Sequence, residues 1–190
     1  MFVVDLSADG VWLSAPVASD TGAITTACAD PDIAEWTTLP EPYTRADAER
    51  FVRRTVPVGW ADRNPTWAIR LRAGGTVSGM IGLMSHDESA AEIGYWLAAG
   101  ARSRGVMTAA VKVVCDFGFR SDGMGLERIE WRAFVGNHSS ARVARNVGFQ
   151  YEGIQRLGLV QRGRRRDAWA AALLAGDPRK PAAGWPSSVG

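Results

Sequence analysis

Segments in which apolar and polar residues alternate predict the strands of this chain. Successive side chains of a strand point to opposite faces, so a period of two marks a strand with one buried face. Residues 91–98 show this most clearly, because Ile93, Tyr95 and Leu97 fall on one face. The same pattern predicts further strands over residues 10–15, 67–71, 77–83, 128–135, 151–161 and 164–174.

Helices are predicted where apolar residues recur every three or four positions. The segment that begins at Thr108 has this spacing, with apolar residues at 110, 113, 114 and 117. Shorter helices are expected over residues 21–29, 31–36 and 139–147, and the last should stop at Gly148, because glycine readily terminates a helix. Thr44 and Asp47 resemble a capping box, which predicts another helix start after Thr44.

The order of these elements indicates the fold class. A strand and helices precede a three-strand meander, and a helix, a strand, a helix and a final strand pair follow. Strands mixed with crossover helices favour an α/β or α+β sheet that helices cover on both faces. A length of 190 residues fits one domain, which we expect to span residues 1–176. Residues 177–190 are rich in Pro, Ala, Gly and Ser, and we expect a mobile tail there.

Composition excludes several classes of function. The chain has 22 Lys and Arg against 20 Asp and Glu, and a net charge of +2 argues against nucleic-acid binding as its main task. No apolar run is long enough for a transmembrane helix, and the N-terminus lacks the basic start of a signal peptide. Cys28 and Cys115 lie far apart in the sequence, which favours free thiols in a reducing cytoplasm.

The segment after the strand at 91–98 carries the clearest chemical signal. Its residues 100–105 form a short basic loop that leads into a helix. The first amides of a helix lack internal partners and lie at the positive end of its dipole, so such a place binds phosphate. Arg102 and Arg104 add positive charge, and Gly105 allows a close approach of the backbone. An ordinary loop with exposed arginines is the alternative, and the chain lacks a P-loop motif.

Four motifs in order resemble one family. Residues 102–107, Arg-Ser-Arg-Gly-Val-Met, resemble the Gln/Arg-x-x-Gly-x-Gly/Ala acyl-CoA signature of the GNAT N-acetyltransferase superfamily, with Met107 in place of Gly or Ala. Residues 91–97 resemble the strand before that signature. Residues 137–153 and 158–168 are similar to the later half and the closing hairpin of RimJ/RimL-type members. The resemblance implies a GNAT-like fold, with a mixed, mostly antiparallel sheet and helices on both faces.

The resemblance also implies a reaction. A member of this family transfers an acetyl group from acetyl-CoA to a primary amine by direct attack on the thioester, without a metal. The amine would belong to a peptide or protein N-terminus, an amino acid or a small molecule. The pantetheine arm would pair with strand backbone, and the pyrophosphate would bind loop amides. The residues so implied are Trp96, Leu97, Ala98, Arg102, Ser103, Arg104, Gly105, Val106, Met107, Thr108 and Asn137.

Two residues match catalytic positions of the family. Glu92 matches a general base, and its alternative role is that of a solvated strand residue. Ser140 matches the proton donor to the leaving thiolate, and it could equally be a first-turn helix residue. Asn137 would contact the pantetheine, cap a helix, or do both. Trp36, Tyr43 and Trp60 could line an acceptor pocket or pack in the core; Trp67, Trp131 and Trp169 are expected in the core.

Other functions and partners remain open at this point. Another acyl-CoA such as succinyl-CoA could be the donor, or the domain could bind acyl-CoA without catalysis. Relatives of this type often form dimers, and the sequence leaves open whether this chain forms a homodimer. A cytoplasmic location and no membrane partner are expected. The charges are also divided: residues 1–89 carry 7 basic and 12 acidic groups, whereas residues 90–190 carry 15 and 8. The basic half contains the phosphate loop, and the acidic half suits a cationic amine.

Overall fold

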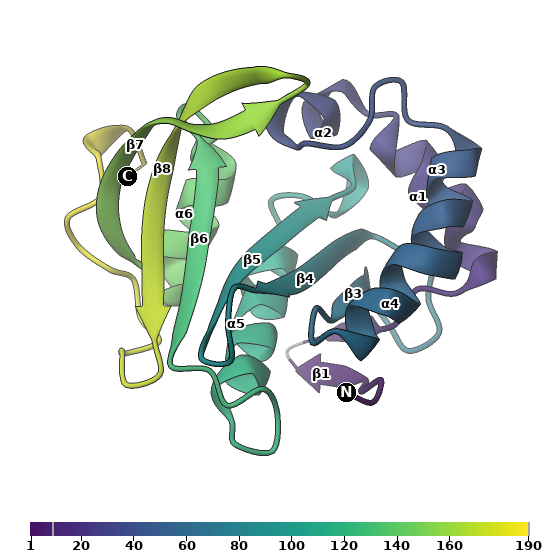
Figure 1. Cartoon of the computed structure of the whole chain (residues 1–190), viewed down its shortest axis with the longest axis horizontal. Coiled ribbons are helices and arrows are strands. Elements are labelled where there is room, and N and C mark those ends of the chain that lie inside the picture. The colour runs from purple at the N-terminus through teal and green to yellow at the C-terminus, as the bar shows by residue number, and fades with distance from the viewer. Residues whose placement is uncertain (9, 190) are drawn as a thin grey trace.

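An eight-stranded sheet forms the centre of the computed structural model, which describes residues 1–8 and 10–189 (Figure 1). Asp9 in the predicted domain and Gly190 in the predicted tail lie outside the described residues. The strand order is β1-β2-β3-β4-β5-β6-β8-β7. The strands are β1 (Leu6–Ala8), β2 (Val11–Ser14), β3 (Thr66–Arg70), β4 (Gly79–Ser85), β5 (Ala90–Leu97), β6 (Arg128–Phe134), β7 (Gln150–Gln161) and β8 (Arg164–Leu174).

The pairing confirms a mixed, mostly antiparallel sheet. Neighbouring strands of the described chain run antiparallel, except that β5 and β6 run parallel. The alternation pattern predicts every strand except β1, which lies at one edge of the sheet and has only three residues.

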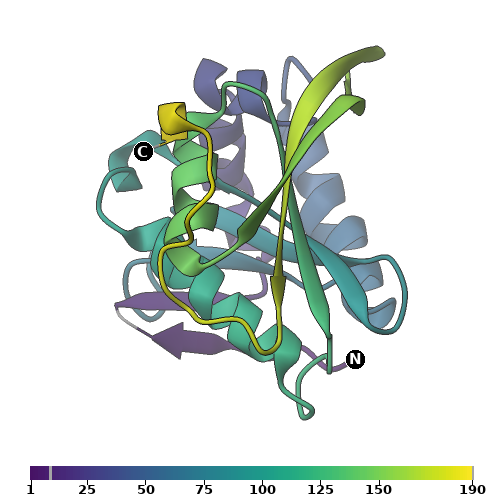
Figure 2. The ribbon, with the colours of Figure 1, turned by 90° about the vertical axis from the view of Figure 1, so that its left-hand side faces the viewer.

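Helices cover both faces of the sheet, as predicted (Figures 1 and 2). One face carries α1 (Thr21–Cys28), α2 (Pro31–Trp36) and α3 (Arg45–Arg50), and α3 continues through a π-helical turn into α4 (Val56–Ala61). The other face carries α5 (Val106–Phe119) and α6 (His138–Val147). Short 3-10 turns are η1 (Ala18–Asp20), η3 (Ala99–Ala101) and η4 (Ser187–Val189). None of the described helices has both the length and the apolarity that a membrane span requires.

Local capping chemistry sets the helix boundaries that the sequence predicts. The Asp47 amide donates to the Thr44 hydroxyl at 3.3 Å, and the Thr44 amide donates to the Asp47 carboxylate at 2.9 Å. This reciprocal pair confirms the capping box. Gly148 ends α6 with φ at +116°, a left-handed conformation that glycine adopts without steric cost.

The core contains the expected tryptophans. Trp67, Trp131 and Trp169 are all buried, as predicted. Trp60 is also buried and packs edge-on against Trp67, with ring centroids 5.0 Å apart, so it belongs to the core. Both cysteines are free and buried, also as predicted. Burial raises the pKa of both thiols, that of Cys28 to about 12, so neither is a reactive thiolate.

Described residues of the C-terminal tail pack against the domain. The tail runs along α6 in Figure 2. The Trp185 indole donates to the Phe149 carbonyl at 3.0 Å and lies 5.5 Å from the Trp131 ring. Val189 is fully buried, and the Ala182 amide donates to Arg145. One tryptophan and one valine thus supply apolar contacts to a segment that is otherwise poor in large apolar side chains, and composition does not predict these contacts.

Candidate active site

The strands β5 and β6 diverge after a short parallel ladder. They pair only from Ala90 to Glu92 on β5 and from Arg128 to Glu130 on β6. Farther along, β5 stays paired with β4 as far as Leu97, and β6 stays paired with β8 as far as Phe134. We call residues 93–97 of β5 and 131–134 of β6 the β5–β6 fork (Figure 1). Backbone groups on its two inner edges have no partner strand, so the fork can accept an extended ligand between the strands.

The loop after β5 is shaped to bind an anion. Ser103 and Gly105 have φ values of +59° and +74°, and left-handed residues in such a turn aim successive amides into one concavity. The amides of residues 103–108 donate to no residue that the structure describes. A pocket of about 340 Å³ lies where α5 begins, lined by Gly10, Val11, Leu71, Arg104, Gly105, Val106 and Ala109.

The Arg102 side chain is turned away from this loop. Its guanidinium pairs with Asp30 at 2.7 Å and Asp32 at 2.8 Å, and its Nε donates to the Leu97 carbonyl at 3.1 Å. Two carboxylates at the start of α2 therefore neutralise the charge that the sequence analysis counted toward the phosphate. Arg104 lines the pocket and has no carboxylate partner within the described residues, so it is the cationic side chain of the loop.

Glu92 lies at the base of the fork, at the last position paired with β6. Its side chain is only 12% exposed and forms an ion pair with Arg132. Both contacts fall on one carboxylate oxygen: Oε2 accepts from Nε at 3.0 Å and from Nη2 at 2.5 Å. Oε1 accepts no hydrogen bond from a described residue. Glu92 is therefore held in an ion pair and not freely solvated, an arrangement that fits a structural role as well as a catalytic one, and Oε1 stays available for proton transfer.

Ser140 lies in the first turn of α6 and bonds to two aromatic side chains. Its hydroxyl accepts from the Trp131 indole and donates to the Tyr95 hydroxyl, both at 3.1 Å. Tyr95 in turn donates to the Ser140 carbonyl at 3.1 Å. Burial raises the pKa of Tyr95, so its phenol stays protonated. The two hydroxyls form one hydrogen-bonded unit beside the fork.

Residues 11–150 match a family model described as an acetyltransferase (GNAT) domain. The chain belongs to the GNAT acetyltransferase family. This confirms the family, the fold class and the enzyme class that the motifs indicated: the chain is an N-acetyltransferase. Within the described residues, no group of three or more His, Cys, Asp or Glu side chains could hold a metal ion.

Relatives extend the match beyond the family model. The Bacillus subtilis (strain 168) protein YdaF, named provisionally as a ribosomal N-acetyltransferase, is 33% identical over 148 residues, covering 75% of this chain and 78% of YdaF. Mycobacterium smegmatis RimJ, solved with CoA-disulfide, has a TM-score of 0.77 at 22% identity over 91% of this chain and 87% of its own. Microcin C7 self-immunity acetyltransferase MccE, solved with acetyl-CoA and AMP, has a TM-score of 0.78 at 18% identity, and the match covers 88% of this chain and 93% of MccE. At these identities the two solved structures establish the shared fold.

The GNAT chain brings the predicted site residues to one region. The strand residues Trp96 and Leu97 lie on the fork, and residues 102–108 follow it. Asn137 caps α6, accepting from the Ser140 amide at 3.2 Å, so its predicted capping role is confirmed. Sequence reasoning missed Tyr95 and Arg132 as partners of the catalytic candidates. The signal for Tyr95 was a phenol on a buried strand face, because a buried tyrosine hydroxyl needs a hydrogen-bond partner.

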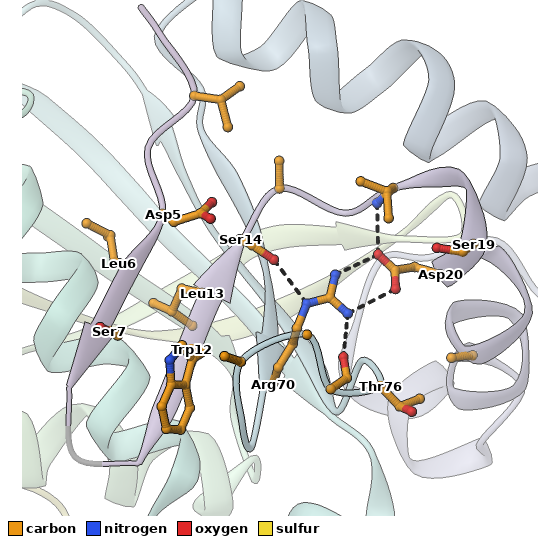
Figure 3. A pocket seen from close by; sticks show the side chains of 17 residues that line it. Asp5, Leu6, Ser7, Trp12, Leu13, Ser14, Ser19, Asp20, Arg70 and Thr76 are labelled. Atoms are coloured by element: carbon orange, nitrogen blue, oxygen red, sulfur yellow. Dashed lines mark hydrogen bonds and ion pairs between the residues drawn. The ribbon is translucent and has the colours of Figure 1, made fainter.

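A second pocket lies at the β1 edge of the sheet, away from the predicted site residues (Figure 3). It encloses about 780 Å³. Its charged groups are Asp5, Asp20 and Arg70, and the last two form a bidentate pair with distances of 3.0 and 2.7 Å. Ser14 and the Gly75 carbonyl also accept hydrogen bonds from Arg70. Arg70 and Asp20 thus satisfy each other, and Asp5 is the lining charge with no ion-pair partner among the described residues.

Proposed function

We propose that this chain moves the acetyl group of acetyl-CoA to a primary amine, and that the amine is a peptide or protein N-terminus. The observation that carries this proposal is the β5–β6 fork followed directly by the loop with free amides at the start of α5. Acetyl-CoA, when bound, supplies the acyl thioester. The acceptor class is supported by the relative YdaF, whose name describes it as a ribosomal N-acetyltransferase.

The proposed contacts of acetyl-CoA follow from the free backbone groups. The β5 segment 96–98 would carry the pantetheine arm mainly through the Leu97 amide, because the Leu97 carbonyl already accepts from Arg102 and the Ala98 amide already donates to Ser78. The amides of residues 103–108 would hold the pyrophosphate. Asn137 would contact the pantetheine through Nδ2, which has no partner within the described part of the chain. Met107, the departure from the family signature, is buried in the core, so its side chain does not crowd the loop. Arg104 adds positive charge beside it.

The proposed proton path crosses the sheet. Glu92 lies on the face that also carries α1 and α3, whereas Tyr95 and Ser140 lie on the α5–α6 face. The amine would lose its proton to Glu92 Oε1, directly or through a water molecule. As the tetrahedral adduct breaks, the electrons of the C–S bond would go to the thiolate, which would take a hydrogen from the Ser140–Tyr95 pair. The pair would regain a proton from the second proton that the amide nitrogen loses.

Two rival functions are tested against this one. A succinyl donor would need a free guanidinium near the thioester: Arg132 is paired with Glu92, and the unpaired Arg166 lies farther along, beside Phe134. A domain that binds acyl-CoA without catalysis would show binding and no turnover. Assays of acetyl-, propionyl- and succinyl-CoA with a panel of peptides and small amines, followed by thiol release, separate the three. The cytoplasmic location stays a prediction, and the homodimer stays open.

Saturating acetyl-CoA is expected to raise the melting temperature. A ligand at 100 times its dissociation constant stabilises the folded state by about 2.7 kcal/mol. Pantetheine lacks the pyrophosphate that the loop amides would hold, so it should give a clearly smaller shift at the same concentration. Differential scanning fluorimetry measures both. An unchanged melting temperature with acetyl-CoA, or equal shifts with both compounds, would contradict the assigned loop.

Removing either hydroxyl of the proton-donor pair should slow the reaction. We expect Ser140→Ala and Tyr95→Phe each to lower kcat about tenfold, and the double variant to cost little more, because each loses the same hydrogen-bonded unit. Steady-state thiol release at saturating acetyl-CoA measures this. Matched controls are Ser139→Ala, its exposed neighbour, and Tyr151→Phe, whose hydroxyl bonds to no described residue. Independent, fully additive losses would show that the two hydroxyls do not act together.

A further inference from the structure

The β7–β8 hairpin is fastened to the end of α2 at the open end of the fork (Figure 1). Gln161 is buried, and its Nε2 donates to the carbonyls of Ala34, Glu35 and Thr37 at 3.3, 2.7 and 2.8 Å. The neighbouring Arg162 pairs with Glu41 at 2.9 Å. These contacts satisfy carbonyls that the last turn of α2 leaves without partners. The hairpin and α2 therefore form one fixed joint.

Arg166 is held inside this joint by two aromatic rings. Its guanidinium carbon lies 4.4 Å from the Phe134 ring centroid and 5.7 Å from that of Trp36. Its Nη1 donates to the Gln161 side chain at 2.6 Å and reaches the Glu35 carbonyl at 3.5 Å. Nε and Nη2 donate to no described residue. The side chain is thus fixed in place while keeping donors free.

The charge of Arg166 is not balanced by a carboxylate. The other arginines around the fork are paired: Arg132 with Glu92, Arg102 with two aspartates, and Arg162 with Glu41. No described carboxylate lies within 4.0 Å of the Arg166 nitrogens. The aromatic rings offset part of the cost of a partly buried cation. The remaining cost of burying the Arg166 charge would be lowered by an anionic group of a bound ligand.

Arg166 lies on the same face of the sheet as Glu92. Arg132, the partner of Glu92, is in register with Ala170 on β8, and Phe134 is in register with Ala168. Glu92 is in register with Glu130 and so with Ala172, which puts the Arg166 backbone six residues, about 20 Å, farther along the strand. The Glu92 carboxylate contacts Arg132, two positions along, so about four residues, or about 13 Å, separate that contact from Arg166. An extended peptide covers that span in about four residues. A peptide with its amine at Glu92 would bring its third or fourth residue to Arg166.

We propose that Arg166 binds a carboxylate of the acceptor, so that the preferred acceptors are peptide N-termini with Asp or Glu at the third or fourth residue. This inference rests on the proposed function and narrows its substrate class. Arg166 acts here as a specificity-determining residue, because its free Nε and Nη2 can form a charge-assisted, two-point contact with a carboxylate.

Two matched peptides test the inference: Ala-Gly-Glu-Glu-Gly-Ala amide and Ala-Gly-Gln-Gln-Gly-Ala amide. We expect the acidic peptide to have a kcat/KM about tenfold higher, through a lower KM, since a charge-assisted contact is worth about that factor. Arg166→Gln should reduce the acidic peptide to the level of the amide peptide. It should leave the rate with a small amine that lacks an anion, such as phenethylamine, unchanged. Arg166→Lys should restore part of the preference.

Arg164→Gln is the matched control, because Arg164 is exposed, lies two residues away on the same strand and has no carboxylate partner within the described residues. It should keep the preference. Titration of both peptides into the CoA-bound protein, followed by tryptophan fluorescence, gives a readout that needs no turnover. Preferential binding without turnover would refute the proposed acetyl transfer but retain the Arg166 contact. Three results would overturn the inference. The parent protein could bind the two peptides equally, or the preference for the acidic peptide could survive in Arg166→Gln. Alternatively, Arg166→Gln could lower the rate with phenethylamine as much as the rate with the acidic peptide.

Discussion

Replacing Glu92 by Gln is expected to lower kcat about 100-fold at neutral pH, the lower end of what a positioned base contributes. The variant keeps the shape of the side chain, and its amide oxygen can still accept from Arg132. It cannot take a proton from the amine. In the proposed site acetyl-CoA would bind through loop amides and the edge of β5, so its affinity should be unchanged. Thiol release at saturating substrates and thermal shift with acetyl-CoA measure the two quantities.

Glu130→Gln is the matched control for this experiment. Glu130 is the register partner of Glu92 on β6, is also partly buried, and pairs with Arg128 at 2.9 Å. It has the same charge and strand environment without the proposed role, so its kcat should stay near that of the parent. An unchanged kcat in Glu92→Gln would remove the base from the mechanism. The rate would then come from positioning of the reactants in the fork.

Local features of this chain are readable from its sequence. The strand expected over residues 91–98 is Ala90–Leu97, and the capping box at Thr44 forms as predicted. These elements depend on periodicity and on contacts within a few residues. The helix expected from Thr108 starts two residues earlier, at Val106, because the left-handed Gly105 serves as its N-cap. Family motifs supplied the site, since four weak signals in order are specific together.

Contacts between distant segments could not be predicted from the sequence. Arg102 looked like a phosphate ligand because it lies in the loop, yet its partners Asp30 and Asp32 come from a helix about 70 residues earlier. The fork exists because the β5–β6 ladder stops after three positions, and no periodicity encodes where a ladder ends. Composition likewise missed the tail contacts, where Trp185 lies against Trp131.

Replacing Asp20 by Ala is expected to lower the free energy of unfolding by about 3–5 kcal/mol. Asp20 and Arg70 each have side chains only 9% exposed, and they form a bidentate pair (Figure 3). The Asp20 carboxylate also accepts from the Val17 amide at 2.8 Å. Removing it leaves the Arg70 charge buried without a counter-ion and an amide without its acceptor. Urea unfolding followed by tryptophan fluorescence measures the change.

The size of this effect depends on burial and not on pairing as such. Arg120 and Asp122 form a bidentate pair of similar geometry, at 2.8 and 3.0 Å, but both side chains are well exposed. Asp122→Ala should therefore leave stability nearly unchanged, because solvent screens an exposed pair. Replacing both buried partners, as Asp20→Leu with Arg70→Met, should recover most of the loss, since no unpaired charge remains. Equal effects of Asp20→Ala and Asp122→Ala would show that the Arg70 charge reaches water through the adjacent pocket.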